Sequence, residues 1–277
     1  MVKDEIIRES IADGSFYPGD PDILRGQINK FLDSTESSDM ENIKAIICPH
    51  AGYIYSGQVA AYSYRQIAGK KFDSIFIIAP SHSEYFNFIS LYNGNAYRTP
   101  LGLVYIDKER AKILADKSSV IELSTYGHND EHSLEVQLPF LQVLFEDIKI
   151  VPIVIGQQNS QNIKELGNAV GNLFKNENIL IVASTDLSHY HPYDVAVTLD
   201  KKVEELVGGF DPEKLMLEFL RNNAEMCGGG PVISASALIL SFENNPPYAH
   251  LIKSGISFKF NSSSIVLDSR VFSPRPS

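Results

Sequence analysis

The residues of this chain best suited to chemistry are histidines that follow short apolar segments. His50, His82 and His189 each come shortly after a segment typical of a buried strand, and Asp186 precedes the last of them. Ligands of an open parallel sheet bind beyond the carboxyl ends of its strands, so these side chains are expected at one rim. Imidazoles gathered at one place bind metals or transfer protons. The pattern therefore predicts a site at this rim and leaves its chemistry open.

A fourth histidine is expected to reach the same rim. His132 begins a predicted helix, and His128, four residues earlier, would share its helix face if both were helical. However, Asn129 or Asp130 suits an N-cap and Glu131 suits a first helical turn, which places His128 outside the helix. A lone histidine is more often a loop residue satisfied by a backbone carbonyl. The weaker candidates are His128, His191 and His250.

The two cysteines lie far apart in the sequence, so no disulfide framework is expected. Cys48 lies inside an apolar segment and is predicted to belong to the core. Cys227 precedes a predicted turn at residues 228–231, which contains three glycines, and then a helix. Glycines allow a ligand to approach the backbone, and a helix N-terminus favours a thiolate. The alternative is a small buried residue beside a tight turn.

Composition excludes several classes of protein. The chain has 277 residues and a net charge of −10, with no basic stripe, which disfavours nucleic acid and an anionic membrane surface as partners. Residues 1–5 are not an apolar signal sequence, and no apolar run is long enough to span a bilayer, so a cytoplasmic protein is expected. No Gly-x-Ser-x-Gly motif is present, which excludes an α/β-hydrolase.

The elements that must position these residues alternate between short apolar and amphipathic segments. This alternation predicts a single α/β domain over residues 1–277, with a central, mostly parallel sheet flanked by helices. The predicted buried strands are residues 44–48, 74–79, 149–155 and 179–184. The predicted helices are residues 56–68, 108–117, 131–145, 160–175, 195–207, 212–222 and 232–242. Pro139 predicts a kink or break in its helix, and residues 250–260 and 264–272 predict an edge hairpin.

A series of short motifs, in order along nearly the whole chain, resembles the Memo family. Each motif alone is modest evidence, but all of them in order are highly specific. They are Ala-Asp-Gly-Ser-Phe-Tyr-Pro at 12–18, Pro-His-Ala-Gly-Tyr at 49–53, Ser-Gly at 56–57, Pro-Ser-His at 80–82, Arg-Thr-Pro-Leu-Gly at 98–102, Asp-Glu-His-Ser-Leu-Glu at 130–135, Leu-Pro at 138–139, Ser-Thr-Asp-Leu-Ser-His at 184–189, and Cys-Gly at 227–228.

The resemblance implies the fold of class III extradiol dioxygenases, which hold non-haem Fe(II) with two histidines and a glutamate. It implies that His50 and His82 are metal ligands and that Cys227 replaces the glutamate. His132 and His189 match the remaining active-site histidines, with His189 as the acid/base group, and Asp186 would orient it. The implied metal is iron or copper, with zinc possible. Because a thiolate is softer than a carboxylate, catechol cleavage is not expected to carry over.

Two functions are therefore expected as rivals. The first is a metal-dependent oxidoreductase of unknown substrate that uses the mononuclear site. The second is a non-catalytic module that binds a peptide or partner protein in the same cleft, as described for Memo-like signalling adaptors in animals, with Tyr53, Tyr55 and Arg98 as possible contacts. The resemblance further implies radical SAM and AMMECR-type proteins as partners.

Overall fold

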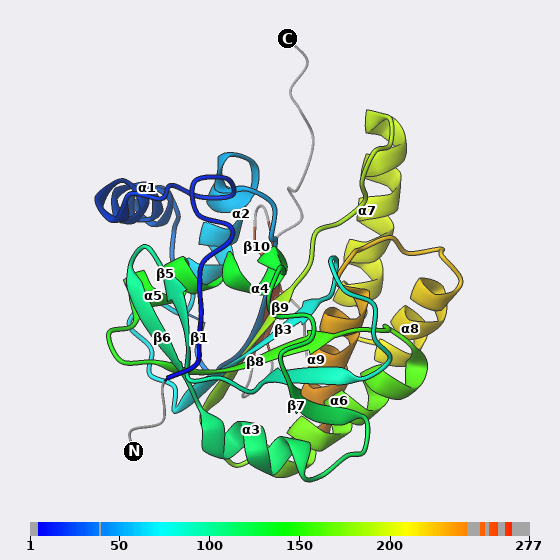
Figure 1. The fold of residues 1–277 in the computed structure, drawn as a ribbon. Helices are drawn as coiled ribbons and strands as arrows, with labels where there is room; N and C mark the ends of the chain where they lie inside the picture. The colour runs from blue at the N-terminus through cyan, green and yellow to red at the C-terminus, as the bar shows by residue number, and fades with distance from the viewer. Residues whose placement is uncertain (1–4, 39, 243–249, 253–254, 260–263, 268–277) are drawn as a thin grey trace.

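A twisted sheet of 12 strands runs through the centre of the molecule, and helices cover both of its faces (Figure 1). The computed structural model describes residues 5–38, 40–242, 250–252, 255–259 and 264–267. The strand order is β1-β5-β6-β8-β3-β9-β2-β12-β11-β10, and β4 pairs with β8 and β7 beside this path. The four middle strands β8, β3, β9 and β2 are mutually parallel. The predicted α/β fold with a mostly parallel sheet is confirmed.

The strands fall into a parallel centre and two outer regions. Their bounds are β1 Ile7–Arg8, β2 Ile43–Cys48, β3 Ser74–Pro80, β4 Ile89–Tyr92, β5 Ala96–Thr99, β6 Gly102–Ile106, β7 Ile121–Ser124, β8 Lys149–Ile155, β9 Ile179–Ser184, β10 His250–Ile252, β11 Gly255–Lys259 and β12 Ser264–Leu267. All four predicted buried strands are present. Of the predicted terminal hairpin, β11 and β12 form an antiparallel pair, but the segment 250–260 contains two strands, β10 and β11, rather than one. Residues 253–254, 260 and 268–272 of that prediction lie outside the described residues.

Nine helices are present among the described residues. Their bounds are α1 Pro21–Asp33, α2 Tyr53–Arg65, α3 Lys108–Ala115, α4 His132–Glu135, α5 Leu138–Leu144, α6 Ser160–Phe174, α7 Tyr193–Gly208, α8 Pro212–Leu220 and α9 Gly229–Phe242. The helix predicted over residues 131–145 is broken into α4 and α5, as Pro139 indicated. Proline is tolerated in the first turn of α5, where its missing N–H costs no helical hydrogen bond. None of the described helices is long and apolar enough to cross a membrane.

Two local predictions are wrong. Residues 229–231 belong to α9 rather than to a turn. The N-cap of α4 is Glu131, whose carboxylate accepts a hydrogen bond from the Ser133 N–H, and not Asn129 or Asp130. In each case the helix begins a few residues away from the predicted position. Local sequence patterns do not fix helix boundaries to a single residue.

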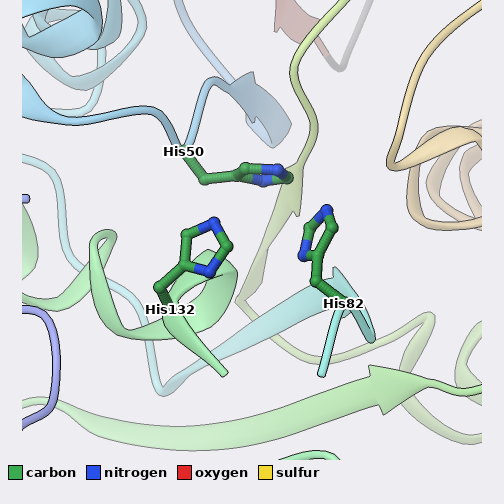
Figure 2. A group of neighbouring side chains, drawn as sticks. All are labelled: His50, His82 and His132. Carbon is green, nitrogen blue, oxygen red and sulfur yellow. The ribbon is translucent and has the colours of Figure 1, made fainter. Parts of the chain in front are cut away.

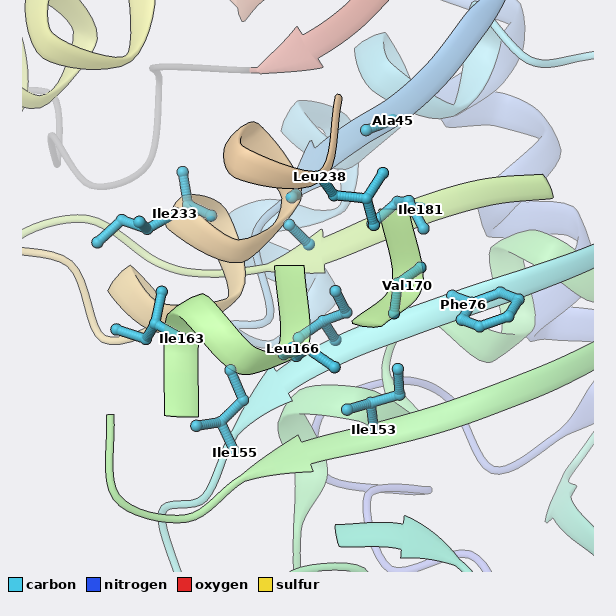
Figure 3. Packing of buried hydrophobic residues seen from close by; sticks show 14 of the residues in the cluster. Ala45, Phe76, Ile153, Ile155, Ile163, Leu166, Val170, Ile181, Ile233 and Leu238 are labelled. Carbon is cyan, nitrogen blue, oxygen red and sulfur yellow. The ribbon is translucent and has the colours of Figure 1, made fainter. Parts of the chain in front are cut away.

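The sheet is rigid because its two faces pack against separate hydrophobic clusters. Alternate residues of β3 point to opposite faces, so Phe76 belongs to one cluster and Ile77 to the other. Figure 3 shows the first cluster, in which Ile163, Leu166 and Val170 of α6 lie along the sheet residues Ile155, Ile153 and Phe76. Strands buried on both faces fix the positions of the loops that follow them, and those loops carry the predicted site.

Candidate metal centre and its pocket

The carboxyl ends of β2, β3 and β9 place their loops side by side, as the sequence predicted. His50 lies two residues beyond β2, and His82 lies two residues beyond β3. Parallel pairing of β9 with both strands brings Asp186, two residues beyond β9, to the same rim. His132 reaches it from the first residue of α4.

The three imidazoles of His50, His82 and His132 surround a common space (Figure 2). The ring centroids are 5.1 Å apart for His50 and His82, 5.7 Å for His50 and His132, and 5.0 Å for His82 and His132. One ligand nitrogen of each ring lies within 4.8 Å of one ligand nitrogen of the others. His50 is buried, whereas His82 and His132 are partly exposed. Three convergent imidazoles on separate elements are a donor set suited to iron, copper or zinc.

The hydrogen bonds of His50 determine which nitrogen is available. Its Nδ1 lies 2.8 Å from Ser184 Oγ. Ser184 Oγ donates its single hydrogen to the Ser133 carbonyl and accepts from Gln137 Nε2. The hydroxyl can therefore only accept from His50, so Nδ1 carries the proton and Nε2 keeps its lone pair. Burial lowers the pKa of His50 to about 4, which keeps the ring neutral at neutral pH.

Glu131 orients the other two rings. Its Oε1 lies 2.9 Å from Nδ1 of His82 and 3.4 Å from Nδ1 of His132, and its Oε2 accepts from the His82 backbone N–H. Burial acts to raise the pKa of Glu131, but the hydrogen bonds from His82 outweigh it and lower the pKa to about 2. A buried carboxylate that holds Nδ1 leaves Nε2 of each ring facing away from it, the arrangement typical of metal-binding histidines.

Cys227 also contacts His50. Its Sγ lies 3.0 Å from His50 Nε2 and accepts a hydrogen bond of 3.1 Å from the Asp186 backbone N–H. A Cβ at Gly228 would lie 2.1 Å from the Ser184 carbonyl oxygen, so only glycine lets this segment pack against the end of β9. Burial and the Asp186 carboxylate raise the pKa of the Cys227 thiol to about 12. Without a metal the group is therefore a thiol.

His50 thus belongs to two groups that could bind a metal. The first is His50, His82 and His132, and the second is His50, Asp186 and Cys227. The predicted ligand set of His50, His82 and Cys227 draws on both groups. The structure brings His82 and Cys227 each beside the His50 ring.

Asp186 and His189 form an ion pair beside this centre. Asp186 accepts from the His50 backbone N–H at 2.8 Å, and its Oδ2 lies 3.7 Å from His189 Nε2. Burial acts to raise the pKa of Asp186, but the neighbouring His50 and His189 outweigh it and lower the pKa to about 2. The interaction with Asp186 in turn raises the pKa of His189. This pairing is the one expected of an acid/base histidine with an orienting carboxylate.

A pocket of about 480 Å³ opens next to the histidines. His132, Asp186 and His189 form the inner part of its wall. The other lining residues are Phe16, Ala51, Gly52, Tyr55, Ser188, Tyr190, His191 and Ala196. The Phe16 ring stacks on His132 with centroids 4.4 Å apart, so the N-terminal segment covers one face of the site. The volume lies in the range of small-molecule sites.

The family is decided by comparison with known proteins. The model of the family described as Memo-like protein matches residues 8–261. The chain belongs to the Memo family. A MEMO1 family protein of Nitrosopumilus maritimus is 37% identical over 235 residues, which cover 83% of this chain and 86% of that protein. A MEMO1 family protein of Methanosarcina barkeri is 35% identical over 229 residues, which cover 82% and 84%.

Among solved structures, this Memo-family chain matches an uncharacterized protein from Escherichia coli K12. The match has 14% sequence identity and a TM-score of 0.45, and it covers 65% of this chain and 79% of the other.

Several sequence candidates of this Memo-family chain lie away from the centre. His128 is fully buried, and its two ring nitrogens form hydrogen bonds with Tyr97 Oη and the Ser90 carbonyl. This agrees with the prediction of a loop histidine satisfied by a backbone carbonyl. Tyr53 is buried with its hydroxyl on the Val136 carbonyl, so it is not a cleft contact. Arg98 forms an exposed ion pair with Glu9 and does not line the pocket. The side chain of His250 lies outside the described residues.

Sequence analysis missed three residues that shape the site. Glu131 was assigned a helix-terminal role only, and Ser184 and Gln137 were not considered as site residues. The signal for Glu131 was its position directly before His132. Its contact with His82, 49 residues away, is a tertiary contact that no local pattern contains.

Proposed function

We propose that this Memo-family protein binds one metal ion at this centre, which is iron or copper, with zinc as the alternative. We propose further that it acts as a metal-dependent oxidoreductase on a substrate in the adjoining pocket. The observation that carries the proposal is the common orientation of His50 and His82. In both rings Nδ1 is bonded to a protein acceptor, which leaves Nε2 with a lone pair. Rings held in this way direct Nε2 toward a metal.

Two side chains compete for the place of the third ligand. His132 is favoured by proximity, because it lies in one group with His50 and His82. Cys227 is favoured by the family resemblance and by its Sγ, 3.0 Å from His50 Nε2. Metal coordination would displace the thiol proton, since thiolate is the form that ligates. Both sets contain His50 and His82.

The chain's own residues supply binding and proton transfer. A bound iron or copper ion would provide redox chemistry at an open coordination position beside the pocket. His189, held by Asp186, carries a proton at the pocket wall and would exchange it with the substrate. Phe16 covers His132 and limits the access of water from that side.

Metal content measured by elemental analysis tests the proposal. Protein purified without an affinity tag, and reconstituted anaerobically with Fe(II) or Cu(I), is expected to hold about one equivalent. The His50→Ala variant is expected to hold none, because it removes the residue shared by both groups. His191→Ala is the matched control, since His191 lines the same pocket but belongs to neither group. Retention of metal by His50→Ala would refute the site.

The absence of metal from reconstituted wild-type protein would instead favour the peptide- or partner-binding module. The radical SAM and AMMECR-type partners are a proposal from the family resemblance alone. A pull-down from the native host with this chain as bait tests them, and recovery of neither protein would count against that association.

A further inference from the structure

Two of the side chains that line the pocket are largely exposed tyrosines, Tyr55 and Tyr190. Tyr190 is fully exposed, yet its backbone has a φ of 63°, in the left-handed region that glycine favours. A bulky residue held in this conformation without a buried ring indicates a functional constraint. Tyr55 lines the same pocket and is also largely exposed, and the Tyr190 ring lies 5.9 Å from that of His189. Aromatic faces are thus presented to whatever enters.

The carboxylates in and behind the wall outnumber the one imidazole that the structure favours as protonated, that of His189 in its ion pair with Asp186. Asp186 lines the pocket, and three further carboxylates contact lining residues from behind. Glu225 bonds the ring of His191 at 2.8 Å, Asp200 accepts from the Ser188 N–H at 3.0 Å, and Glu131 lies beside His132. No lysine or arginine lines this pocket among the described residues. Such a wall attracts cations and repels anions.

The wall contains one buried hydroxyl. Ser188 lines the pocket and is 3% exposed, and its hydroxyl lies beside the Asp200 carboxylate. A polar ligand group at this place would find a hydroxyl and a carboxylate together. The wall therefore offers a hydroxyl, carboxylates and aromatic faces together.

We infer that this pocket selects small primary amines that carry an aromatic or apolar body, and discriminates against the corresponding carboxylates and phosphates. The ammonium group would be held by the Asp186 side of the wall and by the faces of Tyr55 and Tyr190, the combination used for cation recognition elsewhere. The inference names a ligand class for the pocket of the proposed function, but it does not require a metal. An anionic phosphopeptide is the ligand this wall fits least.

Three probes with the same phenol ring test the inference: tyramine, the neutral alcohol tyrosol, and 4-hydroxyphenylacetate. Calorimetric titrations are made on the protein as purified and again after dialysis against a chelator. Tyramine is expected to bind at least about tenfold more tightly than 4-hydroxyphenylacetate in the chelated protein, with tyrosol between them. Equal or tighter binding of the carboxylate in the chelated protein would overturn the inference.

Two variants assign the effect to the pocket. Tyr190→Gly removes the ring, and glycine suits the left-handed backbone conformation at this position. The variant is expected to bind tyramine about threefold more weakly than the wild type, without loss of thermal stability. Glu225→Gln is expected to reduce the ratio of the affinity for tyramine to the affinity for 4-hydroxyphenylacetate by a similar factor. Tyr105→Ala on β6 is the matched control, because Tyr105 is exposed but does not line the pocket. Unchanged tyramine binding in both Tyr190→Gly and Glu225→Gln would refute the assignment.

The outcomes separate this inference from the proposed function. Failure of metal uptake leaves the amine preference of the chelated protein intact. Equal binding of amine and carboxylate leaves the metal content intact.

Discussion

Two buried histidines of this molecule have similar surroundings but opposite roles. His50 and His128 are both almost inaccessible to solvent, and burial lowers the pKa of His50 to about 4 and that of His128 to about 3. Around His128 the protein satisfies both ring nitrogens, through Tyr97 Oη and the Ser90 carbonyl. Around His50 it bonds Nδ1 to Ser184 Oγ, and the partner of Nε2 is the Cys227 thiol, itself a candidate metal ligand.

The difference shows that burial and a lowered pKa do not by themselves identify a functional histidine. The kind of hydrogen-bond partner distinguishes the two, because the partners of His128 are fixed structural groups, whereas the Cys227 thiol beside His50 Nε2 would lose its proton to bind a metal itself. His128 therefore stabilises the fold, and His50 is available for ligand binding.

Removal of the structural histidine is expected to have the largest effect on stability. His128→Ala removes the hydrogen-bond partner of the buried Tyr97 hydroxyl and leaves a cavity in the core. The substitution should lower the free energy of unfolding by about 3 kcal/mol. Metal stoichiometry of the folded variant should stay unchanged. Urea unfolding and elemental analysis measure the two quantities, and loss of metal from folded His128→Ala would remove the distinction between the two histidines.

Loss of the carboxylate that orients His82 and His132 is expected to weaken metal binding without abolishing it. Glu131→Gln should reduce metal affinity by about 10- to 100-fold, the usual effect of removing such a partner. A competition titration against a chelator of known affinity measures the change. An affinity equal to that of the wild type would show that Glu131 serves the helix terminus only.

Acid is expected to destabilise the metal-free protein partly through His128. The unfolded imidazole binds a proton below about pH 6.5, whereas the folded one stays neutral down to about pH 3. The stability that the neutral His128 contributes is thus fully present above pH 6.5 and is lost as the pH falls. Between pH 6 and pH 4 the stability of His128→Gln should fall less steeply than that of the wild type, by about 1 kcal/mol per pH unit. The free energy of unfolding is measured by urea unfolding at each pH, and identical slopes against pH in the two proteins would contradict this. His191→Gln is the control for a more exposed histidine.

The smallest expected effect concerns the ring that covers the site. Phe16→Leu removes the stacking on His132, a contact worth about 0.5–1 kcal/mol, and should weaken metal binding by a few-fold. The same chelator competition measures it. Tighter binding in the variant would show that Phe16 obstructs the site rather than supports it.

The sequence predicted the parts of the fold that repeat a local pattern. The strands over residues 74–80 and 149–155 are continuous apolar runs, so their existence and parallel pairing followed from composition and spacing. The strands β4 to β7 were missed, because each has only four or five residues and depends on tertiary pairing, and β5, β6 and β7 are only partly buried.

The site was predicted to the level of which loops meet, and no further. Histidines after strands place His50, His82 and His189 at one rim, because parallel strands share a carboxyl edge. The hydrogen bonds of Ser184 and Glu131 decide which nitrogens are available, and these join residues far apart in the chain. The grouping of His132, rather than Cys227, with His50 and His82 likewise depends on distances that no spacing rule gives.

X-ray absorption spectroscopy of the metal-reconstituted protein tests the central claim most directly. We expect imidazole scattering from at least two histidines in the wild type, lost in His50→Ala and retained in His191→Ala. A sulfur shell at about 2.3 Å would identify Cys227 as the third ligand, and its absence would favour His132. An identical spectrum from His50→Ala would place the metal elsewhere and contradict the account.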